Sequence, residues 1–284
     1  MASYLRIFLL LVCLGALSWY SFSSGPSSDE QQGITKTAVD LANCQQQLAQ
    51  SRMQTYAEHY ILPYQFKLLS WNIYKAQIDG LLTDLQKLND NADIVLLQEA
   101  IEEPALTKLK PYWRFAKGYK SGGVQSGVMT LSRWPAAVHC TLTHVEPWLR
   151  SPKATNIVEY ALPDQQLLLS INLHGINFTF GVSDFKQQLD DAASIMRMHK
   201  GPIVFAGDLN TWSDERQALL QQTLTQLGLH EAIYLDDKRT KAFGLALDQV
   251  WVRGVKIETT VVPELASSDH NPIIATLTIE HQTL

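Results

Sequence analysis

Short apolar runs of strand length alternate with stretches of helical length from residue 66 to residue 280, and this alternation constrains the fold more than any other feature. FKLLSWNIY (66–74) and DIVLLQEA (93–100) predict buried strands, and IDGLLTDLQKLND (78–90) predicts an amphipathic helix. Further strands are expected at 126–132, 166–174, 202–209, 247–254 and 273–280, and further helices at 183–199 and 214–227. The pattern predicts one α/β domain over 65–284, but the spacing does not show whether its strands run parallel.

The N-terminus has a different amino-acid composition. Tyr4–Tyr20 is apolar with Arg6 as its only charge, and the Ser/Gly/Pro-rich stretch SFSSGPSS follows it. This pattern predicts a signal peptide or membrane anchor over residues 1–24, with a buried core helix as the alternative. Residues 25–64 are polar and Gln-rich and are expected to form a linker, with a possible helix from about Thr37 to Tyr60.

The compartment depends on what the N-terminal segment does. If it is exported or anchored, the domain faces the periplasm or the exterior; if it is buried, a cytoplasmic location becomes possible. Cys44 and Cys140 fit no metal-binding spacing and can pair in an oxidising compartment. The sequence does not decide whether they do.

Polar side chains recur at the C-terminal ends of the expected strands. One edge of an α/β sheet gathers such strand ends, and ligands bind there. A single residue of this kind is usually an ordinary loop residue, but six separate segments carry one. The residues are Asn72, Gln98, Glu99, Asn172, His174, Asp208 and Asn210, joined by Asp248 at the start of a strand and by Asp269 and His270 before the last strand.

The chemistry of these side chains is consistent with a divalent metal. Mg²⁺ and Mn²⁺ prefer carboxylate and amide oxygens. Glu99 is the leading ligand candidate, with a helix cap as its alternative role, and Asp269 offers a second carboxylate. His270 can transfer a proton while Asp248 holds its imidazole in one tautomer. Asp208 can then position or deprotonate a water, with Asn210 fixing an oxygen of the substrate.

Seven motifs in order resemble a known family. They are WN (71–72), QE (98–99), SR (132–133), NLH (172–174), GDLN (207–210), LDQVWV (247–252) and SDH (268–270). Together they resemble the endonuclease/exonuclease/phosphatase superfamily, which has the deoxyribonuclease I-like fold. LLSWNIYKAQ and SSDHNP are most similar to its bacterial YafD-like branch.

The resemblance implies a two-sheet α/β sandwich flanked by helices that hydrolyses phosphate esters with Mg²⁺ or Mn²⁺. It places Asn72, Glu99 and Asp269 in the metal shell, with Asn72 also facing the phosphate. It assigns catalytic roles to Asp208, Asn210, Asp248, His174 and His270. Arg133 and Asn172 are implied as further substrate-binding residues.

The substrate is open at this stage. The segment from Lys108 to Lys153 carries eight Lys or Arg and only one acid, Glu146, which favours a nuclease acting on DNA or RNA. The formal net charge of −5 argues against non-specific duplex binding. The apolar N-terminus favours instead a lipid or inositol-phosphate phosphodiesterase or phosphatase associated with a membrane. A non-catalytic phosphate-binding module is the third possibility, and no feature predicts a protein partner.

Overall fold

The computed structural model describes residues 37–280, and Thr37–Leu284 forms one compact unit. The segment expected to be a linker therefore belongs to this unit from Thr37 onward. The signal peptide or anchor expected at 1–24 lies outside the described residues. None of the helices in the described part of the chain has the length and apolar character needed to cross a membrane.

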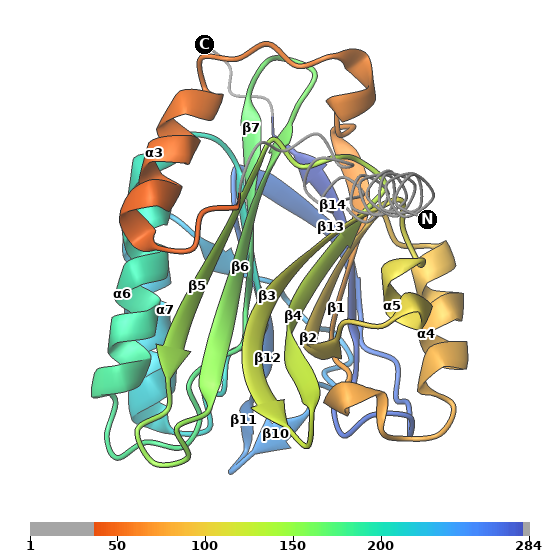
Figure 1. Cartoon of the computed structure of the whole chain (residues 1–284), viewed down its shortest axis with the longest axis vertical. Coiled ribbons are helices and arrows are strands. Elements are labelled where there is room, and N and C mark those ends of the chain that lie inside the picture. Colours follow the sequence, from red (N-terminus) through yellow and green to blue (C-terminus); the bar gives the residue numbers. More distant parts are fainter. Residues whose placement is uncertain (1–36, 281–284) are drawn as a thin grey trace, which may run out of the picture. The chain divides into compact units, whose positions relative to one another are not determined.

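Two six-stranded mixed sheets face each other, which confirms the expected two-sheet sandwich (Figure 1). The first sheet has the order β13-β14-β1-β2-β4-β3, and the second has the order β5-β6-β7-β8-β12-β9. The strands of the first are β13 (Val255–Val261), β14 (Ile273–Ile279), β1 (Gln65–Asn72), β2 (Ile94–Ile101), β4 (Val124–Ser132) and β3 (Tyr112–Ser121). Those of the second are β5 (Val138–Val145), β6 (Pro152–Ala161), β7 (Leu167–Leu173), β8 (Ile203–Asp208), β12 (Asp248–Arg253) and β9 (His230–Glu231).

Helices cover the outer faces of both sheets (Figure 1). The second sheet is covered by α3 (Leu41–Ser51), α6 (Ser183–Met198) and α7 (Asp214–Gln226), and the first by α4 (Leu81–Asp90) and α5 (Pro104–Thr107). Two apolar cores result, one between each sheet and its helices. Short elements complete the fold: η1 (Glu58–Tyr60), η2 (Tyr74–Ala76) and the hairpin of β10 (Lys241–Ala242) and β11 (Leu245–Ala246).

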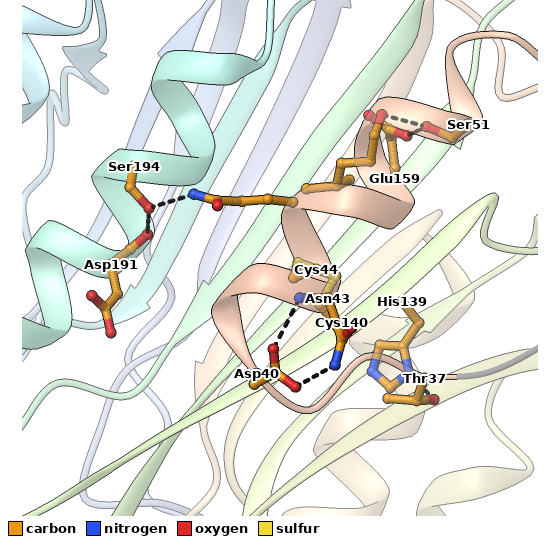
Figure 2. The surroundings of a disulfide bond; sticks show 12 residues. Thr37, Asp40, Asn43, Cys44, Ser51, His139, Cys140, Glu159, Asp191 and Ser194 are labelled. Carbon is orange, nitrogen blue, oxygen red and sulfur yellow. Dashed lines mark hydrogen bonds between the residues drawn. A yellow bond between two sulfur atoms is a disulfide. The ribbon is translucent and has the colours of Figure 1, made fainter.

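The helix expected from Thr37 to Tyr60 is shorter in the structure. Asp40 caps α3 by accepting a hydrogen bond from the backbone N–H of Asn43 at 2.9 Å, so the helix begins only at Leu41. At the other end, Ser51 turns inward and donates to the buried carboxylate of Glu159 (Figure 2). The disulfide Cys44–Cys140 ties α3 to β5, so the pairing that the sequence left open is formed.

Four full-length strands were not expected from the sequence: β3, β5, β6 and β13. Each lies towards the edge of its sheet and mixes polar with apolar residues, so it lacks the continuous apolar run that predicted the central strands. The central strands β1, β2, β7 and β8 were all expected within two residues of their observed ends. They are also the strands that carry the polar residues described next.

Candidate active site

Strand directions bring the predicted polar residues to one end of the sandwich. β1 runs parallel to β2, and β7 runs parallel to β8, so their C-terminal ends lie together within each sheet. β12 is antiparallel to β8, which places Asp248 directly opposite Asp208. β14 is antiparallel to β1, so the segment before Ile273 lies beside the end of β1 and brings His270 to Asn72. We call this end of the sandwich the site end.

The backbone at the end of β8 requires glycine. Gly207 has a φ of 143°, and a Cβ there would lie 2.0 Å from the carbonyl oxygen of Leu173 in β7. Only glycine permits so close an approach. Asn210 then adopts a left-handed φ of 51°, which asparagine tolerates better than most residues. The GDLN sequence thus fixes the direction in which Asp208 leaves the sheet.

Asp208 lies at the centre of the site and is buried. Its Oδ2 accepts a hydrogen bond from Asn72 Nδ2 at 2.9 Å. His174 Nε2 lies 3.4 Å from the same oxygen, and His270 Nε2 lies 4.0 Å from it. The backbone N–H of Asn210 donates to Oδ1 at 3.2 Å. Four of the predicted residues therefore surround one carboxylate.

The Asp248–His270 pair predicted from the sequence is present. His270 Nδ1 lies 2.6 Å from Asp248 Oδ2, and both side chains are buried. The position of His270 is fixed from the backbone as well, because Trp71 Nε1 donates to its carbonyl oxygen at 2.7 Å. Ser268 Oγ donates to the carbonyl oxygen of Asn72 at 2.7 Å, which links the SDH loop to the end of β1.

Burial and neighbouring charges separate the protonation states of these groups. Burial raises the pKa of Asp208 to about 6, with Asp248 adding to the rise and His270 opposing it. Burial alone would lower the pKa of His270, but the carboxylates of Asp248 and Asp208 outweigh it and raise that pKa to about 10. Near neutral pH, Asp208 is therefore a base and His270 is an imidazolium.

His174 has the opposite character. Burial lowers its pKa well below the usual value, and the charge of Lys153 lowers it further. Lys153 Nζ lies 2.8 Å from His174 Nε2, so the neutral ring accepts a hydrogen bond from the ammonium group. Lys153 also lies 3.9 Å from the buried carboxylate of Glu146. Glu146 therefore helps to hold the Lys153 ammonium beside His174.

Glu99 and Asp269 lie at the site end but outside the central cluster. Glu99 sits at an irregularity in the pairing of β2 with β4 and has a left-handed φ of 50°. This conformation is rare for a non-glycine residue and is found at functional sites. Its carboxylate pairs with Lys75 Nζ. Asp269 is exposed.

The structure does not bring Asn172 and Arg133, which the resemblance implied as substrate-binding residues, into the cluster around Asp208. Asn172 is fully buried, and its amide donates to the carbonyl oxygens of Leu97 and Met129 at 3.2 and 3.0 Å. It therefore holds the two sheets together. Arg133 follows β4, which is antiparallel to β2, so it lies at the opposite end of the sandwich and pairs with Asp93 at 3.0 Å.

Two cations at the site were not singled out from the sequence. Lys153 was counted only as part of a basic segment, and Lys75 was not considered. Lys153 lies near the start of β6, and β6 is antiparallel to β7, so recognition of that strand would have placed it beside His174. Lys75 offered a weaker signal: it follows the WN motif directly, but its left-handed backbone was not predictable.

A cleft of about 290 Å³ adjoins the cluster. Its lining includes Lys75, Glu99, Lys153 and His174, which are buried or half-buried, and Tyr119, Leu149 and Phe178, which are exposed. A cleft of this size accepts one small group rather than a large flat surface. Charged residues therefore stand deep in the cleft and apolar residues at its mouth.

Comparison with known proteins gives the family. The sequence model described as the Endonuclease/Exonuclease/phosphatase family matches residues 69–270, which include each polar residue placed at the site end. The chain belongs to this family. A UPF0294 protein of Vibrio vulnificus (strain YJ016) is 36% identical over 221 residues, covering 75% of this chain and 76% of the relative. A UPF0294 protein of Vibrio campbellii is 32% identical and covers 98% of this chain and 100% of the relative.

Solved structures of the endonuclease/exonuclease/phosphatase family share the fold at low sequence identity. The family member from Beutenbergia cavernae has a TM-score of 0.57 at 16% identity, covering 76% of this chain and 72% of that chain. The human Nocturnin catalytic domain with bound sulfate has a TM-score of 0.56 at 15% identity, covering 77% of this chain and 96% of that chain. These likenesses confirm the sandwich.

The raised pKa of His270 predicts a pH-dependent stability. Protonated His270 stabilises the folded state fully below its unfolded pKa of about 6.5, and this contribution is lost as the pH rises through about 10. The free energy of unfolding, measured in EDTA, should be lower at pH 10 than at pH 7. This fall should be larger in the native chain than in His270→Gln, by on the order of 3 kcal/mol. Urea titrations at both pH values measure this difference. An equal fall in the two proteins would contradict the raised pKa, and exposed His59→Gln is the control.

Proposed function

We propose that this protein is a divalent-metal-dependent phosphoester hydrolase in which water attacks phosphorus. The observation that carries the proposal is the buried cluster around Asp208, where a base, an imidazolium and a neutral imidazole converge on one point. Perturbed pKa values of opposite direction in one site are typical of acid–base catalysis. The family to which the chain belongs supports the same reaction class.

The residues present fit a divalent cation. Asp208, Asp248 and His270 bring possible ligand atoms within 4.8 Å of one another. His270, however, is protonated and bound to Asp248, and an imidazolium has no lone pair for a metal. Glu99 is the better ligand. Its carboxylate pairs with the ammonium of Lys75, so its position already accommodates a positive charge. Asn72 and Asp269 supply further oxygens from neighbouring segments.

Each residue of the cluster then has a defined part in the reaction. A bound cation would supply positive charge for the developing charge on the phosphate and would acidify a water. Asp208 accepts the proton of the attacking water. Asn72 and Asn210 hold the two carboxylate oxygens of Asp208 in place. His270, oriented by Asp248, donates a hydrogen bond to a phosphate oxygen. Lys153 and His174 face the same group from β6 and β7.

The substrate beyond the phosphate is a separate question. The nucleic acid predicted from the basic segment has less support than the sequence suggested, because Lys110 and Arg114 are buried and Arg133 lies at the opposite end. Exposed Lys117, Lys120 and Arg150 remain near the cleft. A lipid or other amphiphilic phosphate ester is the second candidate, favoured by the apolar mouth of the cleft.

We also propose a location in the periplasm or at the exterior. The Cys44–Cys140 disulfide supports it, because disulfides persist mainly in oxidising compartments. The apolar stretch Tyr4–Tyr20 agrees with export or anchoring.

Cell fractionation combined with thiol alkylation tests the location. We expect the full chain in the periplasmic or membrane fraction, with Cys44 and Cys140 resistant to alkylation until a reductant is added. Recovery from the cytosol alone, with both thiols reactive, would establish the cytoplasmic alternative.

Hydrolysis assays test the reaction class. With Mg²⁺ or Mn²⁺ the full chain should hydrolyse bis-p-nitrophenyl phosphate, and EDTA should abolish the reaction. Asp208→Asn and His270→Gln should each lose about 10²–10⁴-fold in rate, the usual worth of one acid–base group or one preorganised donor. Asp164→Asn and His59→Gln, both exposed and outside the cluster, should retain full activity. Unchanged activity in the first pair would exclude this site.

Metal binding tests the role of Glu99 without relying on turnover. In titration calorimetry, Glu99→Gln should weaken Mn²⁺ binding by roughly tenfold or more, because it removes a carboxylate that binds the metal directly. Loss of a residue that only supports a metal ligand already weakens binding by about tenfold. The exposed neighbour Glu102→Gln is the matched control. Normal affinity in Glu99→Gln together with lost affinity in Asp248→Asn would place the metal in the Asp208–Asp248–His270 group instead.

A further inference from the structure

The exposed aromatic side chains of the described residues gather at the site end. Exposed aliphatic side chains are spread over the whole compact unit. The large exposed aromatic side chains, by contrast, all lie near strand ends or in loops at the site end. We call this set the aromatic collar. It consists of Tyr74, Tyr119, Trp148, Phe178, Phe180 and Phe243.

The collar residues come from five separate segments. Tyr74 follows β1, and Tyr119 lies near the end of β3, which runs in the same direction as β2. Trp148 lies in the β5–β6 loop, and Phe178 and Phe180 lie between β7 and α6. Figure 1 shows that these loops and the β10–β11 hairpin, which carries Phe243, share one end of the molecule. The collar therefore lies at the same end as the cleft, and two of its members, Tyr119 and Phe178, line the cleft.

Exposure of these rings is built into the fold. The Trp148 and Phe180 ring centroids lie 3.8 Å apart, yet the two residues remain 53% and 78% exposed. The buried carboxylate of Glu146 holds both loops, accepting from Ser151 Oγ and from the backbone N–H of Asn177 at 2.7 Å. Glu146 therefore fixes the two loops that carry Trp148 and Phe180.

Phe243 is the most exposed member, at 90%. It occupies the turn of the β10–β11 hairpin with a left-handed φ of 52°, and Gly244 follows with a φ of 86°. A bulky ring at such a position is unfavourable for folding alone. Its ring meets Trp212 edge to face with centroids 6.4 Å apart, but this contact leaves most of the side chain in solvent and open to a partner.

The chemistry of the surface favours a lipid bilayer over nucleic acid. Exposed aliphatic residues Val124, Val145 and Leu149 stand among the rings, and aliphatic side chains cannot stack on bases. Aromatic and aliphatic side chains with a few cations at their margin are typical of proteins that lie in a membrane interface. Exposed Lys117, Lys120 and Arg150 provide those cations for anionic headgroups.

We propose that the aromatic collar docks on a lipid bilayer and presents the cleft to a phosphate ester at the membrane surface. The identity of the reaction rests on the proposed hydrolase function, but the docking does not. The cleft then takes a single headgroup with its phosphate beside Lys153 and His174, while the acyl chains of the lipid stay in the bilayer.

Fluorescence quenching tests the docking without reference to catalysis. The full chain is incorporated into vesicles of phosphatidylethanolamine and phosphatidylglycerol that carry brominated acyl chains. The contribution of Trp148 is the difference between the native chain and Trp148→Phe. We expect this contribution to be quenched, and we expect Phe180→Ser/Phe243→Ser to lose most of the quenching. Met53→Ser removes an exposed apolar residue near Ser51, away from the site end, and should change nothing.

Hydrolysis separates docking from chemistry. Phe180→Ser/Phe243→Ser should reduce hydrolysis of vesicle phospholipid roughly tenfold and leave bis-p-nitrophenyl phosphate unaffected, because burial of apolar side chains is lost only at the bilayer. Quenching without any hydrolysis would leave the docking intact and overturn the proposed function. If the Trp148 fluorescence of the native chain is not quenched, the docking proposal is overturned. Weaker binding of single-stranded DNA by the double variant, with no change in quenching, would also overturn it in favour of a nucleic-acid surface.

Discussion

Two hydrogen bonds that cross from one sheet to the other hold the site together. Asn72 of β1 donates to Asp208 of β8, and His270 before β14 pairs with Asp248 of β12. Each bond has one partner on each sheet. The cluster therefore exists only while the sheets keep their spacing, and the buried amide of Asn172 maintains that spacing by bonding to β2 and β4. A residue expected to bind substrate instead determines whether the binding site forms.

Burial makes the cluster reactive, but it also removes the charged side chains from water, which is energetically unfavourable. Asp208, Asp248 and His270 are all largely removed from water, so each charge depends on its neighbours for stabilisation. Burial raises the pKa of Asp208, whereas the carboxylates of Asp248 and Asp208 raise the pKa of His270 against the effect of burial. Both shifts are in the directions that acid–base chemistry at neutral pH requires. Lys75 and Lys153 add positive charge from outside the cluster. Both lysines are held in place at the site end by carboxylates, Lys75 by Glu99 and Lys153 by Glu146.

The opposite end of the sandwich has a structural role. There, α3 is tied to β5 by the Cys44–Cys140 disulfide, and Ser51 bonds to Glu159 beneath it (Figure 2). The segment expected to be a linker consequently covers part of the second sheet. Rigid support at one end and exposed loops at the other agree with the general tendency of proteins to build sites on loops held by a fixed scaffold.

The sequence by itself determined the central strands and the chemical identity of the cluster. Buried strands need continuous apolar runs, and a polar residue that ends such a run is visible without any structure, as Asn72 and Asp208 illustrate. The edge strand β3 and the strand β6, which lies next to the edge, lack that signal, so they and the cation Lys153 at the start of β6 were missed. Only the tertiary structure decided which ends meet. Arg133 follows a strand as Asp208 does, but β4 runs antiparallel to its neighbour β2 and carries Arg133 to the far end. Strand direction arises from long-range pairing, which no local pattern of residues records.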